Sequence, residues 1–90
     1  MANHASALKR HRQNEKRRQR NQALKTRLRH LVRAVREALT ARDPNAAASK
    51  LVDAARALDK AATKGVVHRR NASRRIARLT HAVVQLKTGS

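Results

Sequence analysis

Helix-breaking residues are confined to a few positions in this 90-residue chain, and their placement constrains the fold more than any other feature. Pro occurs only at position 44, and Gly only at positions 65 and 89. The stretches between them are rich in Ala, Leu, Arg and Lys, which are strong helix formers. Three helices are therefore expected, over about residues 3–41, residues 44–64 and residues 68–87.

The residues at the expected helix ends support these boundaries. Asp43 is a suitable N-cap, and Pro44 then occupies the first helical position, where its missing N–H costs nothing. Gly65 follows Lys64 as a typical C-terminal stop for the second helix. The pair Val66-Val67 is too short to form a strand, so the chain is predicted to be all-α.

Apolar residues recur at steps of three and four, as expected for helices that each bury one face. Because short connections join these stripes, we expect an antiparallel three-helix bundle. The first helix would be nearly twice as long as the others, and its part before Leu24 carries almost no apolar residues, so it must extend beyond the bundle. The expected core residues are Leu24, Leu28, Leu31, Val32, Val35 and Leu39 on the first helix, Leu51, Ala55, Leu58 and Ala62 on the second, and Ala72, Ile76, Leu79, Val83 and Leu86 on the third.

The charge of the chain limits its possible partners. It has 23 Lys and Arg against five Asp and Glu, a formal net charge of +18, and no Phe, Tyr or Trp. Such a chain repels itself and is stabilised by a polyanion. Proteins that bind single strands stack bases on aromatic rings, which this chain lacks. The composition therefore predicts phosphate contacts to folded, largely double-helical nucleic acid.

The charge is concentrated at the two ends of the chain. Residues 1–36 carry a net +11 and residues 68–90 a net +6, whereas residues 37–67 carry only +1. We call residues 1–22 the arm and residues 23–90 the bundle, and expect them to form a single nucleic-acid-binding domain. On a helical wheel the basic residues of the arm surround most of the helix, which suits insertion between separate phosphate backbones. A basic tail that is disordered when free and helical when bound fits the same sequence.

Regularly spaced Arg residues also follow the expected bundle helices. Arg70, Arg74 and Arg78 are spaced by four residues on the third helix, with His81 on the same flank. Arg29 and Arg33, with Arg36, form a similar ridge on the first. A solvated helix face is the usual explanation for such stripes, but no acidic residue interleaves here to relieve the repulsion. The neutral amides of Asn14, Gln19, Asn21 and Gln22 could reach ribose hydroxyls and phosphates.

Other classes of function fit the sequence less well. The five His residues show no metal-binding spacing and the chain has no Cys, so we expect no metal, no cofactor and no enzymatic activity. A basic zipper would need three or four heptads, whereas Asp43-Pro44 ends the Leu24–Val35 pattern after about two. No apolar run is long enough to cross a membrane, and interfacial Trp or Phe is lacking. A histone-like DNA-compacting protein is the main alternative.

Beyond these patterns, the chain resembles the bacterial small-subunit ribosomal protein S20 family over nearly its full length. The matching segments are Met1-Ala2-Asn3, Ser6-Ala7, Lys9-Arg10, Glu15-Lys16-Arg17-Arg18, Arg20-Asn21, Asp59-Lys60, Lys64-Gly65-Val66-Val67-His68, and Ala72, Arg74, Arg75, Arg78 and Leu79. The resemblance implies a three-helix bundle with a long N-terminal helix, which binds small-subunit (16S-type) ribosomal RNA as a monomer and bridges neighbouring rRNA helices. It also implies a cytoplasmic protein of the bacterial small ribosomal subunit. Other ribosomal components would be partners only by proximity, and no membrane or small-molecule substrate is expected.

The residues expected to contact RNA lie on the arm and on the first and third helices. They are Lys9, Arg10, Arg12, Lys16, Arg17, Arg18, Arg20, Asn21, Lys25, Arg29, Arg33, His68, Arg70, Arg74, Arg75 and Arg78.

Overall fold

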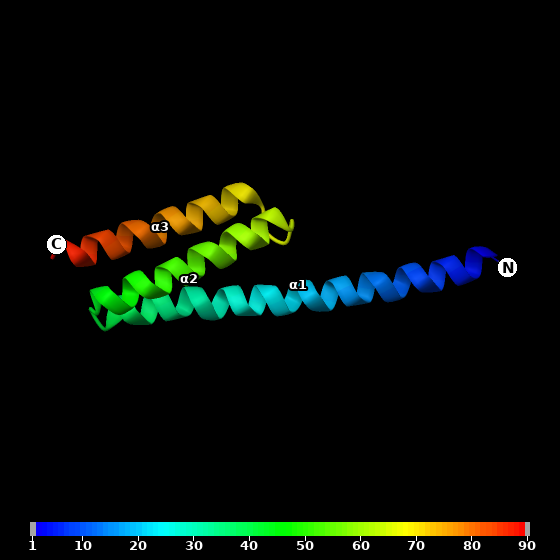
Figure 1. Cartoon of the computed structure of the whole chain (residues 1–90), viewed down its shortest axis with the longest axis horizontal. Coiled ribbons are helices and arrows are strands. Elements are labelled where there is room, and N and C mark those ends of the chain that lie inside the picture. Colours follow the sequence, from blue (N-terminus) through cyan, green and yellow to red (C-terminus); the bar gives the residue numbers. More distant parts are fainter. Residues whose placement is uncertain (1, 90) are drawn as a thin grey trace.

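The chain folds into three helices and a projecting arm. A computed structural model describes the backbone of residues 2–89 and the side chains of residues 5–89. Within these residues the structure consists of α1 (Ala2–Thr40), α2 (Pro44–Thr63) and α3 (Arg69–Lys87), with no strand (Figure 1). The all-α prediction is confirmed, and the ends of the helices lie within one residue of those expected.

The turn between α1 and α2 reverses the chain over three residues. Asp43 donates its backbone N–H to the Ala38 carbonyl at 3.1 Å, and Arg42 donates to the Leu39 carbonyl at 3.1 Å. This pair of bonds is a Schellman motif, whose left-handed position is usually Gly. Here Arg42 occupies it, with φ of 55°. Asp43 then caps α2 as predicted, because its Oδ1 accepts the Ala46 N–H at 3.1 Å.

The turn between α2 and α3 has the same construction with Gly in the left-handed position. Gly65 has φ of 77°. Val66 donates its N–H to the Ala61 carbonyl at 2.9 Å, and Gly65 donates to the Ala62 carbonyl at 3.1 Å. These bonds satisfy two carbonyls that would otherwise be unpaired at the end of α2. The turn therefore has a defined backbone, which fixes the position of Lys64 beside it.

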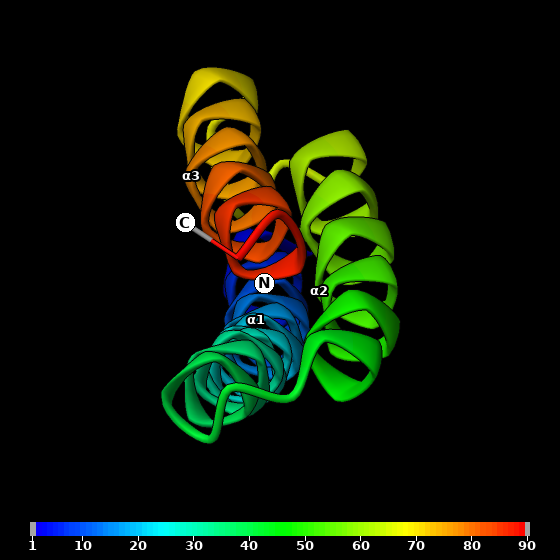
Figure 2. The same cartoon turned by 90° about the vertical axis from the view of Figure 1, so that its left-hand side faces the viewer.

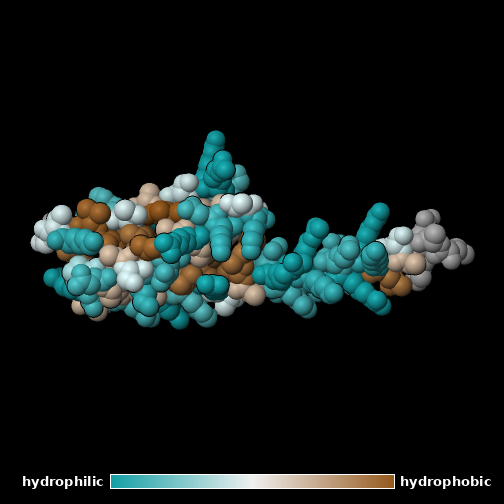
Figure 3. Space-filling model, in the orientation of Figure 1, coloured by the Kyte–Doolittle hydropathy of each residue, from teal (hydrophilic) through white to brown (hydrophobic). Residues whose placement is uncertain are grey.

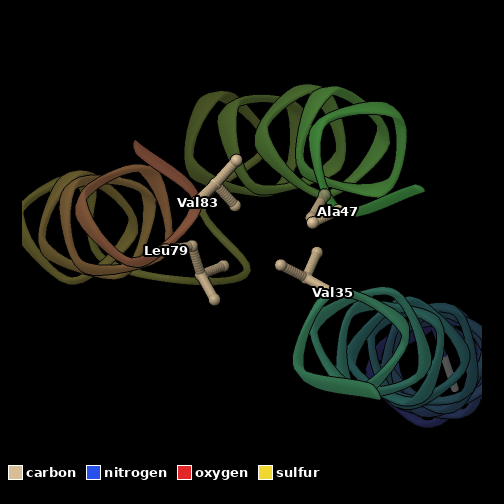
Figure 4. Packing of buried hydrophobic residues seen from close by; sticks show 5 residues of the cluster. Val35, Ala47, Leu79 and Val83 are labelled. Carbon is tan, nitrogen blue, oxygen red and sulfur yellow. The ribbon is translucent and has the colours of Figure 1, made fainter. Parts of the chain in front are cut away.

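The core lies between the three helices in two adjoining clusters. One joins Val35 of α1 to Ala47 and Ala54 of α2 and to Leu79 and Val83 of α3. Figure 4 shows side chains from all three helices pointing toward one another here. The second cluster, nearer the α2–α3 turn, consists of Leu28, Leu58, Ala61 and Ala72.

The buried face of α2 differs from the prediction. Ala55 was expected in the core, but it is only half-buried and belongs to neither cluster. Ala62 was also expected there, and it packs against the second cluster while remaining half-buried. The fully buried residues of α2 are Ala47, Ala54, Leu58 and Ala61. The helix is thus rotated by about one residue from the expected stripe. The reason is that α2 carries Ala on several faces, and a methyl group does not distinguish one face from the next. The contacts with α1 and α3 decide the rotation instead.

The packing of the bundle is unequal. Figure 2 looks along the bundle and shows the helices at the corners of a triangle. Helix α2 packs closely against both α1 and α3, whereas α1 and α3 touch over a much shorter length. A groove remains along the α1–α3 side of the bundle, and side chains of both helices line it.

The arm continues α1 well past the bundle. The described residues span 68 × 21 × 13 Å, and the long dimension is set by the 39 residues of α1 (Figure 1). From residue 5 to residue 23 every side chain is exposed except the half-buried Glu15, and Leu24 is the first to pack against the core. Figure 3 shows hydrophilic side chains standing out along this part of the helix. The arm leaves the bundle at the end where the α2–α3 turn lies.

Candidate nucleic-acid interface

The space between α1 and α3 is a groove lined mainly by cationic side chains. It has a volume of about 650 Å³ and receives Arg29, Arg33 and Arg36 from α1 and Arg75 and Arg78 from α3. Within residues 5–89, no Asp or Glu lines this α1–α3 groove. Facing guanidinium groups with no carboxylate between them repel one another, and a bound anion would relieve that repulsion.

The sequence spacing explains why these residues face the groove. Arg29, Arg33 and Arg36 follow one another at steps of four and three, on a flank beside the core residues Leu28 and Val35. Such steps keep side chains on one side of a helix. The predicted α1 ridge therefore lines the same groove as Arg75 and Arg78 of α3.

The α3 residues expected to contact RNA do not all lie in this groove. Arg75 and Arg78 line it, beside the buried Leu79. Arg70 and Arg74 are exposed but do not line it. The reason is that α3 presents to α1 the flank next to its core residues, whereas the ridge of residues 70, 74 and 78 spirals away from that flank.

A second cationic hollow lies where the arm meets the bundle. Arg17, Arg20 and Asn21 of the arm face Arg27 of α1 and Lys64 of the α2–α3 turn, around a space of about 730 Å³. Ala23, Leu24 and Val66 form its apolar floor. We call this the junction pocket. Among the described residues that line it there is no carboxylate.

Two cations of the junction pocket were missed by the sequence analysis. Arg27 belongs to neither predicted ridge, and Lys64 lies in the nearly neutral middle region. Arg27 follows Arg20 by seven residues, which is two helical turns and the same face, so this signal was present in the sequence. The approach of Lys64 depends on the antiparallel packing of α2 on α1, which places Ala61 and Ala62 at the end of α2 in one cluster with Leu24 and Leu28.

The remaining arm residues stand free in solvent. Lys9, Arg10, Arg12 and Lys16 are exposed. Within the described part of the chain, an ion pair joins Arg18 to Glu15, with 3.7 Å between Nη2 and Oε2. An exposed pair of this kind adds little stability. The arm thus holds its charges available on all sides rather than neutralising them internally.

His68 combines a structural role with a free donor. Its Nδ1 accepts the backbone N–H of Arg70 at 3.2 Å and so caps α3. A ring nitrogen that accepts a hydrogen bond carries no proton, so the proton of the neutral ring lies on Nε2. The side chain is exposed, and its Nε2–H can donate to a phosphate oxygen.

The described residues provide neither a metal site nor a membrane-spanning helix. No group of three or more His, Asp or Glu between residues 5 and 89 could hold a metal ion. Over residues 2–89, none of the helices has the length and apolar character needed to cross a membrane.

Comparison with known proteins identifies the family. Residues 2–84 match the family described as Ribosomal protein S20. The chain belongs to the ribosomal protein S20 family. It is 54% identical over 83 residues to small ribosomal subunit protein bS20 of Oleidesulfovibrio alaskensis, which covers 92% of this chain and 95% of the relative. The protein of the same name from Nitratidesulfovibrio vulgaris is 55% identical over 86 residues, or 96% of this chain and 99% of the relative.

A third relative matches over a slightly longer part of the chain. Small ribosomal subunit protein bS20 of Solidesulfovibrio magneticus is 52% identical over 88 residues, covering 98% of this chain and 99% of the relative. The resemblance to the S20 family is therefore confirmed, and with it a ribosomal protein whose location is the ribosome in the bacterial cytoplasm. The α1–α3 groove, the junction pocket and the exposed arm are the cationic surfaces of this S20-family member.

Proposed function

We propose that this chain is a structural component of the small ribosomal subunit, which binds 16S-type rRNA directly through phosphate contacts and bridges neighbouring rRNA helices during assembly. It acts as a monomer, without a cofactor and without catalysis. The α1–α3 groove carries the proposal, because five Arg side chains from two helices converge there without a lining carboxylate in the described chain. The relatives named small ribosomal subunit protein bS20 support the choice of RNA.

The mechanism is neutralisation of phosphate by fixed cations. An Arg side chain is always charged and offers a planar fork of donors that matches two phosphate oxygens. Each phosphate that the protein neutralises releases condensed counterions, and this release drives binding. Because α1 and α3 are folded helices, the backbone positions of these Arg residues are set before RNA arrives. Their exposed side chains are ordered only when they bind phosphate, which is part of the cost of binding.

Bridging follows from the positions of the cations around α1. Arg27 lines the junction pocket and Arg29 lines the α1–α3 groove. Two residues along an α-helix correspond to about 200° of rotation, so these side chains leave opposite flanks of α1. Two RNA backbones that approach α1 from opposite flanks would therefore both contact positively charged side chains. The arm, with its cations on all sides, would extend the same arrangement between RNA helices.

Competition binding to small-subunit rRNA and to duplex DNA of equal length, from about 0.05 to 0.2 M salt, tests this proposal. We expect tight binding to rRNA to survive at the upper salt concentration while DNA binding is lost. Parallel loss of both would instead indicate a generic polyanion binder, such as a histone-like DNA-compacting protein.

A paired variant tests the groove itself. Arg33→Gln with Arg78→Gln removes one charge from each wall and should lower the salt slope for rRNA by about 1.5, since each phosphate contact contributes roughly 0.7 to 0.9. Lys50→Gln with Lys87→Gln is the matched control, because these exposed residues line neither the groove nor the junction pocket. Equal slopes for the two variants would refute the groove as a contact surface.

A further inference from the structure

The junction pocket combines four cations with a single neutral amide. Its polar lining consists of Arg17, Arg20, Arg27 and Lys64, together with the neutral amide of Asn21. We propose that this pocket is a ribose–phosphate site, in which the cations bind the backbone phosphate and Asn21 binds the adjacent ribose 2′-hydroxyl. Asn21 would then be a determinant of the preference for RNA over DNA. This inference rests on the proposed function, because it assumes that an RNA backbone reaches the pocket.

The hydrogen-bonding capacity of the side chains supports the assignment. Arg and Lys are donors only, and they bind the phosphates of RNA and DNA alike. Asn has both a carbonyl acceptor and an amide donor. The 2′-hydroxyl also donates and accepts, and it is the group that distinguishes RNA from DNA. Among the described side chains that line the pocket, only Asn21 can therefore accept a hydrogen bond from it.

Three backbone carbonyls at the end of α2 are already engaged. The carbonyl of Ala61 accepts from Val66, and the carbonyl of Ala62 accepts from Gly65. The carbonyl of Lys60 accepts the N–H of Lys64 at 3.0 Å. These three carbonyls are therefore less available to a hydroxyl in the pocket than the exposed amide of Asn21.

The pocket is also held in shape by the core. Leu24 lies one helical turn after Asn21 and packs, with Val66, against the cluster around Leu28 and Leu58. The Gly65 turn fixes Lys64 on the opposite wall. A site built on such anchored elements can be selective, because the backbone that carries its polar groups is already in place when the ligand binds. The farther part of the arm has no comparable support.

Other neutral amides of the arm provide the comparison. Asn14, Gln19 and Gln22 are exposed and do not line the junction pocket. Asn14 is of the same residue type and lies in the interior of the same helix. Asn14→Ala therefore reproduces the effect of Asn21→Ala on helix propensity, without removing an amide from the pocket.

The test measures the affinities of the full-length wild type, Asn21→Ala and Asn14→Ala for small-subunit rRNA and for duplex DNA of equal length. One net hydrogen bond predicts about a 3- to 10-fold loss of rRNA affinity for Asn21→Ala, with DNA affinity unchanged. We expect Asn14→Ala to change the affinities for the two ligands by the same factor, because its amide lies outside the pocket. For Asn21→Ala, an equal loss with both nucleic acids, or no loss with either, would overturn the assignment of Asn21.

Single 2′-deoxy substitutions in the rRNA fragment provide the second arm of the test. At the contacted nucleotide, removing the hydroxyl should weaken binding of the wild type by the same 3- to 10-fold and leave Asn21→Ala unaffected. Absence of any deoxy position with this pattern would contradict the inference even if Asn21→Ala binds RNA weakly. A wild type without preference for rRNA at 0.2 M salt would instead refute the proposed function, so the two failures are distinguishable.

Discussion

Removal of residues 2–22 should separate RNA binding from folding. In the structure the side chains of residues 5–22 are exposed, apart from the half-buried Glu15, and the core begins at Leu24. The deletion therefore takes no described side chain out of the core clusters. It also removes seven Lys and Arg and one Glu, a net +6 of the chain's +18. We expect the remaining bundle to unfold cooperatively, at a temperature equal to or above that of the full chain.

The effect on RNA binding should be large. If each of the seven arm cations neutralises one phosphate, their loss lowers the salt slope by about 5 to 6. Over a fourfold change in salt, a slope difference of that size corresponds to roughly three orders of magnitude in affinity. At low salt both the truncated and the full chain should still bind through the α1–α3 groove, so their affinities for rRNA can be compared directly.

The assay is fluorescence anisotropy with a labelled small-subunit rRNA fragment, at several salt concentrations between about 0.05 and 0.2 M. Circular dichroism and thermal unfolding of the same samples serve as the control for folding. Tight binding by the truncated chain with an unchanged slope would refute the role of the arm. Loss of the cooperative transition would show that the bundle depends on the arm, contrary to the exposure of its side chains.

Three further predictions concern stability and can be measured by urea unfolding. Leu58→Ala opens a cavity at a fully buried position and should cost about 2 to 4 kcal/mol, so a loss below about 1 kcal/mol would contradict the packing. Arg42→Gly should raise the free energy of unfolding by about 0.5 to 1 kcal/mol, because it relieves a positive φ. Gly65→Ala should lower it by a similar amount, because Ala is strained at a positive φ even where open space surrounds the Cβ. Changes of the opposite sign would refute the turn geometry. Leu28→Asp or Leu79→Asp should abolish the transition by burying an unpaired charge, and a retained transition would show that these positions are solvated.

The sequence predicted the helices and turns well because the signals for them are local. Asp43 and Gly65 determine where α2 begins and ends through bonds to residues only three to five positions away. The rotation of α2 was not predictable from its own residues, because Ala lies on several faces. It depends on side chains of α1 and α3, such as Val35 and Leu79, that contact the helix only after folding.

The same distinction applies to the candidate interface. Spacing alone identified the α1 ridge of Arg29 and Arg33, because residues on one face of a helix remain together in any fold. It could not bring Lys64 to Arg27, which are 37 positions apart and line one pocket only because α2 packs antiparallel against α1. The sequence therefore identifies cations that lie on the same face of one helix. The structure is needed to identify cations from different helices that line the same site.

The short contact between α1 and α3 coincides with the cationic side chains that both helices place along their groove. Apolar burial holds each helix to α2, but Arg33 and Arg78 both border the α1–α3 groove, and with no carboxylate among its described lining residues their repulsion opposes closer packing. A phosphate backbone in the groove would reverse the sign of that interaction. Since a ligand that binds only the folded state stabilises it, RNA bound there would strengthen the bundle at the place where its own packing is weakest. A thin, Ala-rich core would then be sufficient, because the surface that lowers the stability of the free protein would be the one that we propose binds RNA.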